Sequence, residues 1–391
     1  MRVSTTLKLE SKRGRGVNLG NVQVLCSFVG GAGHLVPQFP LLRVLVDAGH
    51  DLTLVGRASG ARSAPEGMFR RMETRPDRRA RISDEISPLL PVDRDAEVAV
   101  VAEYFAGDAA RQSAEAIEAV LSSTDLIVCD ELDFGAMAVG AHAGIPVVVV
   151  SVIASGSLVR ADRIGDALER LRLELGLSEP IRYQGDLFVV PFTPTMRAPD
   201  FPAPANAAWM RPDRGLKPDP NGSIVATLGT EFNTESGDLF HRILGALAEV
   251  DAPCVVAVGR DLDPAQFGPQ PSHVRVEQYV DLEALVPHAS VVLHHGGSGL
   301  FMRSVLGGAP QILFPMGADQ PFTADRVQHL GVGCVLDSQT ADSTVIRKRV
   351  AALRDDAKMR DRVKALRTET LALPDPTAVV RKVETLVASA R

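Results

Sequence analysis

The feature that most constrains the fold of this chain is a glycine-rich turn between two apolar segments near its middle. The run Val291–Leu293 has the length and composition of a buried strand, and residues 298–306 have the apolar spacing of a helix. Between them, residues 294–299 read HHGGSG. A strand, a tight turn and a helix in this order form the unit from which parallel α/β sheets are built.

The helix after this turn offers an anion-binding site. Its first backbone N–H groups are unpaired and the positive end of its dipole points toward the turn. Glycines let an anion approach the backbone closely, so we expect a phosphate group here. One of the two histidines can add a further donor, and the Ser298 hydroxyl can cap the helix. The alternative is a plain turn with core histidines.

The chain length of 391 residues is too great for one hydrophobic core and sufficient for two. Each half alternates apolar strand-like runs with helical patterns, which predicts an α/β protein of two Rossmann-like domains with parallel sheets and a cleft between them. The proline-rich stretch near the middle places the domain crossing. We expect an N-terminal extension at 1–20, domains at 21–205 and 221–372, a linker at 206–220, and a C-terminal helix at 373–391 that can pack back on the first domain.

Two polar residues stand at the carboxyl ends of predicted strands in the first half. His34 directly follows a glycine turn, where it faces the crevice in which such folds bind ligands and can act as a base near neutral pH. Asp130 ends the predicted strand 125–130 and can accept the imidazole N–H to orient the ring. Two alternatives stay open: His34 as a surface cap, and Asp130 as the cap of the helix Phe134–Ala143.

Several classes of protein are disfavoured by the sequence. A nicotinamide-binding fingerprint is incomplete, because Val36 stands where its third glycine belongs and Arg57 lies near the position of its acid. The net charge of −6 and the lack of a dense basic stripe argue against nucleic acid as a partner. No apolar run reaches the length of a membrane span. The four scattered cysteines indicate reduced thiols in a cytoplasmic protein and no zinc site.

Other motifs accompany HHGGSG. Residues 315–321 read PMGADQP, and residues 30–37, 226–233 and 259–264 read GGAGHLVP, ATLGTEFN and GRDLDP. With these motifs the chain resembles the GT-B glycosyltransferases of family 1, especially actinobacterial enzymes that decorate natural products such as antibiotics. The resemblance covers roughly residues 21–385. It implies the GT-B fold, with the acceptor site in the first of two facing Rossmann-like domains and the nucleotide-sugar site in the second.

The resemblance also implies roles for single residues. His295 and the backbone of the glycine turn would hold the donor diphosphate, opposite Thr230. Tyr279 and Val280 would meet the nucleobase, and Asp319 and Gln320 the sugar hydroxyls. The full implied donor set is Thr230, Tyr279, Val280, His295, Gly296, Gly297, Ser298, Gly299, Asp319 and Gln320. His34 would be the general base, oriented by Asp130. The acceptor walls would come from residues 58–110 and 150–200, where no single residue stands out.

The implied reaction is an inverting, metal-independent transfer of a sugar or deoxysugar from a nucleoside diphosphate to a natural-product aglycone. The nucleotide sugar is a co-substrate, and no other cofactor or metal is expected. Arg303 stands where many relatives have a ribose-binding Glu, which is compatible with a dTDP donor rather than UDP because thymidine lacks the 2′-hydroxyl. A homodimer is compatible with the resemblance, although no sequence feature decides it.

Two positions motivate other functions. Leu300 stands where a hydroxyl often contacts the phosphate, and Leu282 replaces a frequent Gln beside the nucleobase. The chain can therefore also be a catalytically weak relative that serves as a binding or auxiliary protein. The remaining alternative is a nucleotide-sugar epimerase with the same two-domain fold.

Overall fold

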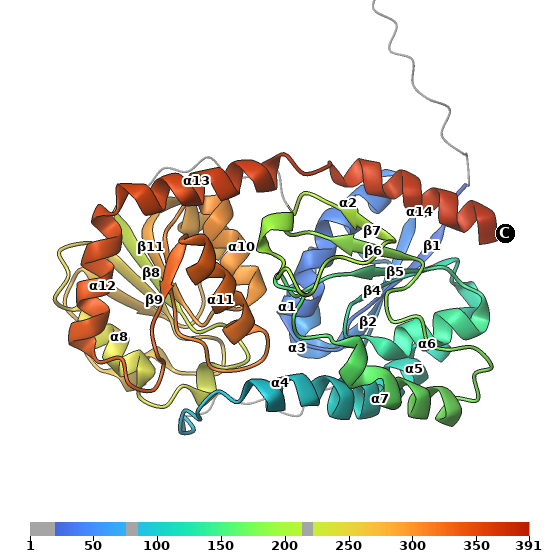
Figure 1. The fold of residues 1–391 in the computed structure, drawn as a ribbon, viewed down its shortest axis with the longest axis horizontal. Helices are drawn as coiled ribbons and strands as arrows, with labels where there is room; N and C mark the ends of the chain where they lie inside the picture. Colours follow the sequence, from blue (N-terminus) through green and yellow to red (C-terminus); the bar gives the residue numbers. More distant parts are fainter. Residues whose placement is uncertain (1–19, 76–84, 213–221, 391) are drawn as a thin grey trace, which may run out of the picture.

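The computed structural model describes residues 20–75, 85–212 and 222–390, and within these ranges the chain forms two α/β domains side by side (Figure 1). The predicted N-terminal extension falls, apart from Gly20, outside the described residues. Each domain has one parallel sheet between layers of helices, which is the predicted architecture. Because helices cover both faces, the central strands are mostly apolar and almost entirely buried.

The first sheet has seven parallel strands in the order β3-β2-β1-β4-β5-β6-β7. Its strands are β1 (Gln23–Ser27), β2 (Asp51–Arg57), β3 (Arg71–Arg75), β4 (Leu126–Asp130), β5 (Val147–Val150), β6 (Leu187–Val190) and β7 (Ala207–Trp209). The strand order changes direction between β1 and β4. Ligands of such sheets bind in the crevice at the carboxyl ends of the two strands beside this switch point. The residues after β1 and at the end of β4 therefore matter most for function.

Helices connect these strands and cover the sheet. They are α1 (Ala32–Leu35), η1 (Val36–Gln38), α2 (Phe39–Asp47), α3 (Ala58–Ala61), α4 (Arg94–Val100), α5 (Ala110–Glu118), η3 (Leu121–Ser123), α6 (Phe134–Ala143), α7 (Ala161–Glu174) and η4 (Pro194–Met196). Between α4 and α5 lies η2 (Val101–Ala109), a π-helical segment with a kink at Gly107. Such segments are rare and occur often at functional sites.

The second sheet has six parallel strands in the order β10-β9-β8-β11-β12-β13. They are β8 (Ser223–Thr227), β9 (Cys254–Ala257), β10 (Val274–Glu277), β11 (Ala289–His294), β12 (Gln311–Leu313) and β13 (Gly333–Val335). The helices are η5 (Asn233–Glu235), α8 (Leu239–Leu247), η6 (Pro264–Phe267), α9 (Leu282–Leu285), η7 (Val286–His288), α10 (Ser298–Gly307), α11 (Gln320–Leu330), α12 (Ser343–Asp355) and α13 (Ala357–Leu371). Here the switch point lies between β8 and β11, next to the HHGGSG turn.

The predicted domain boundary needs one correction. Strand β7 pairs in parallel with β6, so the first sheet continues beyond residue 205 and takes up part of the predicted linker 206–220. Proline-rich sequence concealed this strand. Strand β7 has only three residues and lies at the edge of the sheet, where proline in and around a strand is tolerated.

The C-terminal helix α14 (Pro376–Ala390) leaves the second domain and packs against α2 of the first (Figure 1). Its buried face consists of Val379, Val380, Val383 and Val387, and these side chains join the apolar cluster that contains Leu41 and Leu45. The chain thus returns to the first domain, as the sequence suggested. No helix in the described part of the chain combines the length and the apolar character needed to cross a membrane.

Candidate functional site

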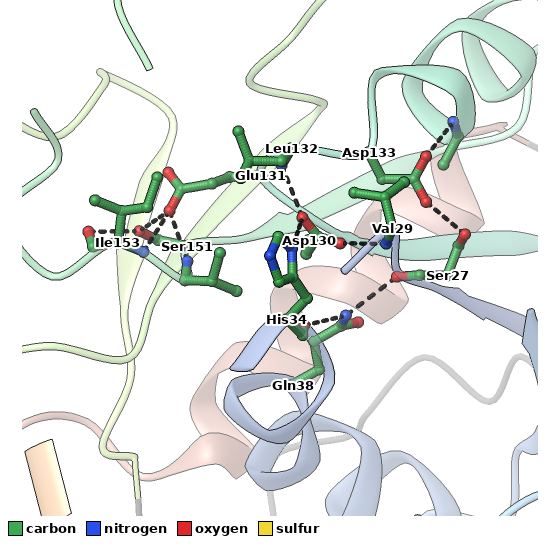
Figure 2. A network of polar contacts seen from close by, with 12 residues as sticks. Ser27, Val29, His34, Gln38, Asp130, Glu131, Leu132, Asp133, Ser151 and Ile153 are labelled. Atoms are coloured by element: carbon green, nitrogen blue, oxygen red, sulfur yellow. Dashed lines mark hydrogen bonds and ion pairs between the residues drawn. The ribbon is translucent and has the colours of Figure 1, made fainter. Parts of the chain in front are cut away.

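His34 and Asp130 meet at the switch point of the first sheet (Figure 2). The imidazole Nδ1 lies 3.1 Å from Oδ1 of Asp130. The Asp130 carboxylate is fully buried, and it also accepts the backbone N–H groups of Leu132 at 2.8 Å and Val29 at 3.0 Å. An ionised carboxylate can only accept, so Nδ1 carries the ring proton and Nε2 is left as the basic nitrogen. The predicted orientation of the ring is therefore present.

The alternative role for Asp130, capping the following helix, belongs to a different acid. Asp133 is the N-cap of α6, where its Oδ1 accepts the N–H of Ala136 at 3.0 Å and its Oδ2 accepts the Ser27 hydroxyl at 2.5 Å. His34 is likewise no cap, because the N-cap of α1 is Gly31. The structure thus separates the two acids by function.

The surroundings of His34 make it a stronger base. Burial lowers the pKa of the imidazole, but the charge and hydrogen bond of Asp130 outweigh this, and Glu231 and Asp319 add to the upward shift. The net result is a pKa raised above its ordinary value. Since Glu231 and Asp319 belong to the second domain, the imidazole stands within the field of both domains.

Phe105 packs against the same ring. Its ring stacks on the imidazole with centroids 5.9 Å apart and planes inclined by 22°. Phe105 lies on the π-helical segment η2, within the range 58–110 from which the acceptor walls were expected. Sequence reasoning did not single it out, because nothing local marks a phenylalanine that meets a histidine seventy residues earlier. The ring also lies against Gly30, where a Cβ would come within 2.1 Å of it.

The two histidines of the HHGGSG turn have different roles. His294 is a core residue: its Nδ1 accepts the N–H of Gly296 at 3.1 Å, and its Nε2 therefore donates to Oε1 of Gln311 at 2.8 Å. His295 has a buried Nδ1 with no hydrogen-bond partner in the described structure. Burial, with a smaller contribution from His294, lowers the pKa of His295 to about 3, so the ring is neutral. Its unused nitrogen fits the predicted role of a donor to a ligand.

Glycines on two loops make room for the His295 ring. A Cβ at Gly229 would lie 2.7 Å from it, and one at Gly297 would lie 2.6 Å from it. Thr230, predicted to approach the phosphate, follows Gly229 and is exposed. The β8 loop and the β11 loop therefore meet at the switch point of the second sheet, as the resemblance requires.

The start of α10 differs from the prediction for Ser298. The N-cap is Gly297, and the Ser298 hydroxyl makes no capping bond. Instead, the backbone N–H and the hydroxyl of Ser298 both donate to Oδ2 of Asp319, at 3.2 and 2.5 Å. A carboxylate of the chain itself thus stands at the helix N-terminus, where an anion is favoured. The predicted cap is therefore wrong, and binding of a phosphate at this helix end stays a prediction.

The segment 316–320 shapes the other side of this turn. Gln320 Oε1 accepts the N–H groups of Met316 at 2.8 Å and Gly317 at 3.3 Å, so its carbonyl oxygen is engaged within the loop. Ala318 has a φ of 51°, a left-handed backbone that costs free energy in an alanine. Backbone strain of this kind is found often at ligand sites. Asp319 and Gln320 therefore lie at the site in a tightly determined loop.

The remaining implied donor residues lie further out. Tyr279 and Val280 follow β10, at the edge of the second sheet, and the guanidinium of Arg260 lies 3.9 Å above the Tyr279 ring. Gly299 is exposed on the first turn of α10. Arg303 forms a 3.0 Å ion pair with Glu283 of α9, and Leu300 is buried.

The two halves of the site meet across the domain interface. The backbone N–H of Ala154, after β5, donates to the Ser298 hydroxyl at 2.8 Å. The Glu231 carboxylate of the second domain fills the space where a Gly31 side chain would be, 2.1 Å from its Cβ position. The carboxyl edges of the two sheets therefore face each other, with the His34 pair on one side and the α10 N-terminus on the other.

Comparison with known proteins agrees with this geometry. Residues 241–386 match the family described as erythromycin biosynthesis protein CIII-like, C-terminal domain. The chain is 32% identical over 191 residues to tylactone mycaminosyltransferase of Streptomyces fradiae, covering 47% of this chain and 41% of that protein. It is 27% identical to elloramycin glycosyltransferase ElmGT of Streptomyces olivaceus over 93% of this chain and 97% of that one. Several curated relatives, including the first, are thus matched over less than half of their length.

Among solved structures, spinosyn rhamnosyltransferase SpnG complexed with thymidine diphosphate superposes with a TM-score of 0.76. The match covers 93% of this chain and all of that one, at 19% identity, and it establishes the shared GT-B fold. The chain therefore has the GT-B fold, and its sequence is similar to those of glycosyltransferases that are named for natural products. Within that fold, the similarity to the erythromycin CIII-like C-terminal domain covers most of the second domain and reaches into the C-terminal helix.

Proposed function

We propose that the protein is a glycosyltransferase that moves a sugar or deoxysugar from a dTDP-linked donor to a hydroxyl group of a natural-product aglycone. The observation that carries this proposal is the basic Nε2 of His34, oriented by Asp130, on the opposite side of the interface from the anion-binding end of α10. The tylactone and elloramycin relatives are named for the same class of reaction on such aglycones.

The His34 imidazole supplies the general base. An acceptor hydroxyl would give its proton to Nε2 while its oxygen forms a bond to the anomeric carbon. Asp130 stabilises the imidazolium that results, because its buried carboxylate faces Nδ1–H. General-base assistance of this kind contributes about 10²–10⁴-fold in rate. Attack from the face opposite the leaving group inverts the anomeric centre.

The second domain would stabilise the leaving diphosphate. As the bond from the anomeric carbon to the phosphate oxygen breaks, its electron pair moves onto the diphosphate. The N–H groups at the start of α10 and the free nitrogen of His295 can stabilise this charge, at a few kcal/mol for each preorganised donor. We propose that these donors act without a metal ion. Asp319, now bonded to Ser298, would move toward the sugar hydroxyls when phosphate enters.

Thymidine is the proposed nucleoside. Position 303 is an arginine, which pairs with Glu283, so it offers no carboxylate for a ribose 2′-hydroxyl. Thymidine lacks that hydroxyl, and SpnG has been solved with thymidine diphosphate. A parallel titration with dTDP and UDP tests this choice: the proposal requires tighter binding of dTDP.

The function is tested with wild-type protein and His34→Ala, using dTDP-sugars and a panel of aglycones, with products identified by mass spectrometry. Wild type should form glycosides, and the variant should bind dTDP equally while losing about 10²–10⁴-fold in turnover. Full transfer by the variant would refute the base. Product formed without acceptor would instead indicate an epimerase.

A second candidate is favoured by buried Leu300, which provides no hydroxyl to a phosphate. A catalytically weak binding or auxiliary protein would bind dTDP tightly but give no turnover with any aglycone in the same panel.

A further inference from the structure

The acid beside the proposed catalytic pair, Glu131, is buried and takes no part in the reaction described above. It follows Asp130 directly at the end of β4. A single oxygen of its carboxylate, Oε1, accepts three donors from the segment after β5: the Ser151 hydroxyl at 3.0 Å and the N–H groups of Val152 and Ile153 at 2.6 Å each (Figure 2). Three donors on one acceptor fix the path of this segment.

The next residue of the same segment reaches the other domain. The Ala154 N–H donates to the Ser298 hydroxyl at 2.8 Å, and both groups are buried. A hydroxyl that accepts on one side presents its proton on another. The Ser298 proton is accordingly directed at Asp319, at the start of α10. Glu131 thus determines, through one short segment, how a hydroxyl is aimed at the proposed phosphate site.

We propose that Glu131 is a positioning residue for the donor: it fixes residues 151–154 so that the Ala154 N–H aims the Ser298 hydroxyl at the donor diphosphate. This inference rests on the proposed function, because it assigns the α10 N-terminus to phosphate. It makes donor affinity depend on a side chain of the acceptor domain. Each domain then contributes to the other's half of the site.

The chemistry of the site supports a carboxylate in this place. Without an acceptor there, two buried backbone N–H groups would lose their partner, and the Ser151 hydroxyl would keep only the carbonyl of Ile153 at 3.4 Å. Burial raises the pKa of Glu131 to about 7, although Arg197 and the three donors lower it. Arg197 itself has a buried Nη1 without a partner among the described residues, so its charge is not neutralised by a closer acid.

The test compares Glu131→Ala and Glu131→Gln with wild type by calorimetric titration of dTDP. Gln keeps a carbonyl oxygen for the three donors, whereas Ala removes it. We expect Ala to weaken dTDP binding about tenfold and Gln to stay within about threefold of wild type. KM for the donor should rise more than kcat falls. Glu115→Ala, an exposed position on α5, is the matched control and should bind as wild type.

A double-mutant cycle shows whether Glu131 acts through Ser298. If it does, Glu131→Ala should cost much less dTDP affinity in a Ser298→Ala background than in wild type. Amide hydrogen exchange supplies a readout independent of nucleotide: Val152, Ile153 and Ala154 should exchange faster in Glu131→Ala and at the wild-type rate in Glu131→Gln. Should Glu131→Ala fail to fold, Glu131→Asp takes its place in the cycle, because the shorter side chain withdraws the carboxylate from its three donors; it should weaken dTDP binding in wild type and much less in the Ser298→Ala background.

The outcomes separate this inference from the proposed function. Wild-type protein that does not bind dTDP overturns the donor site itself. Wild-type protein that binds dTDP while Glu131→Ala binds it equally overturns the positioning role. Additive effects in the cycle also overturn it, because they would mean that Glu131 and Ser298 act independently.

Discussion

At the scale of single residues, three acids at or just after the end of β4 have three different roles. Asp130 orients His34, Glu131 holds the segment after β5, and Asp133 caps α6. The three side chains are chemically alike, and the donors that each one meets decide its role. Burial alone would favour the neutral acid in every case, so a carboxylate persists where hydrogen bonds or a cationic partner offset the cost of desolvation.

The first residue-scale prediction concerns the pH dependence of transfer. A general base must be unprotonated, so the rate should rise with pH through the raised pKa of His34. Asp130→Asn removes the charge that raises this pKa. The acid limb of kcat/KM should therefore move to lower pH, and the plateau should fall by about 10–100-fold because the ring is a weaker base and can adopt the wrong tautomer. Rates measured from pH 5 to 9 check this, and an unmoved acid limb contradicts it.

The second residue-scale prediction concerns stability. The pKa of Glu131 is raised to about 7 in the folded protein, from an ordinary value of 4.5. The folded state therefore binds the proton more tightly than the unfolded state, and stability falls as pH rises through this window. Glu131→Gln lacks this dependence. Its stability relative to wild type should rise by about 2 to 3 kcal/mol between pH 5 and pH 8.

The measurement for this prediction is urea unfolding followed by the fluorescence of Trp209. This is the single tryptophan of the chain, and it lies on β7 in the same domain as Glu131. Its signal thus reports the domain that contains the substitution. A stability difference between the two proteins that is the same at both pH values would show that Glu131 keeps an ordinary pKa.

At the scale of elements, the two sheets place equivalent strand–turn–helix units at their switch points. One is β1 followed by α1, and the other is β11 followed by α10. Each helix start is approached by a carboxylate of the second domain: Glu231 lies against Gly31, and Asp319 bonds to Ser298. The same backbone geometry therefore carries a base in one domain and an anion-binding end in the other.

The sequence predicted those elements whose residues carry their own signal. Buried central strands such as β4 and β5 are apolar runs between turn residues, and the glycine turns mark the starts of α1 and α10. By contrast, β3 is a polar, mostly exposed edge strand, and it is defined by pairing with β2 rather than by its composition. The helical residues after Ser343 form two helices, α12 and α13, because the Asp356 carboxylate accepts the N–H of Met359 at 2.8 Å and so caps a new helix.

The site was predictable to a similar extent. Asp130 ends β4, His295 directly follows β11, and His34 follows the turn after β1, so their placement depends on local turn geometry and on strand order. Phe105 and Ala154 reach the site through packing between distant segments, which no local pattern encodes. As a helix cap, the Ser298 hydroxyl would accept a backbone N–H of its own helix, whereas here it donates to Asp319, and only the fold decides between the two.

The element-scale prediction uses two glycines of the β1–α1 turn. A Cβ at Gly30 would meet the His34 ring at 2.1 Å, whereas a Cβ at Gly33 meets nothing within 4 Å. Asp130 and Phe105 fix that ring, so Gly30→Ala should displace it and lower kcat/KM by about 10²-fold, the size of general-base assistance. Gly33→Ala should keep full activity and gain up to about 1 kcal/mol of stability. Transfer rates and thermal unfolding of both variants decide the matter; equal rates would show that the ring can move without loss.

At the scale of the whole molecule, contacts of different strength join the domains. The ion pair of Arg94 with Asp325, at 2.5 Å, is about half exposed and contributes about 1 kcal/mol or less. Arg326 donates to the carbonyl of Thr195 at 2.8 Å, also near the surface. The apolar packing of α14 on α2 buries four valines and is the larger contribution. This helix makes the stability of the first domain depend on the end of the chain.

The last prediction tests that dependence with Val383→Asp. Val383 is buried among the apolar side chains with which α14 and α2 pack together. Burying that charge costs several kcal/mol, so α14 should detach from α2 instead. The Trp209 signal should then show a first domain destabilised by about 3 kcal/mol or more, and proteases should cut the joining residues 372–375. Because the second domain keeps its own core, dTDP binding should persist.

Lys382→Asp, on the exposed face of the same helix, is the control, since it introduces the same group without burying it. If Val383→Asp is as stable as Lys382→Asp and is cleaved no faster, α14 packs too weakly on the first domain to link the two halves.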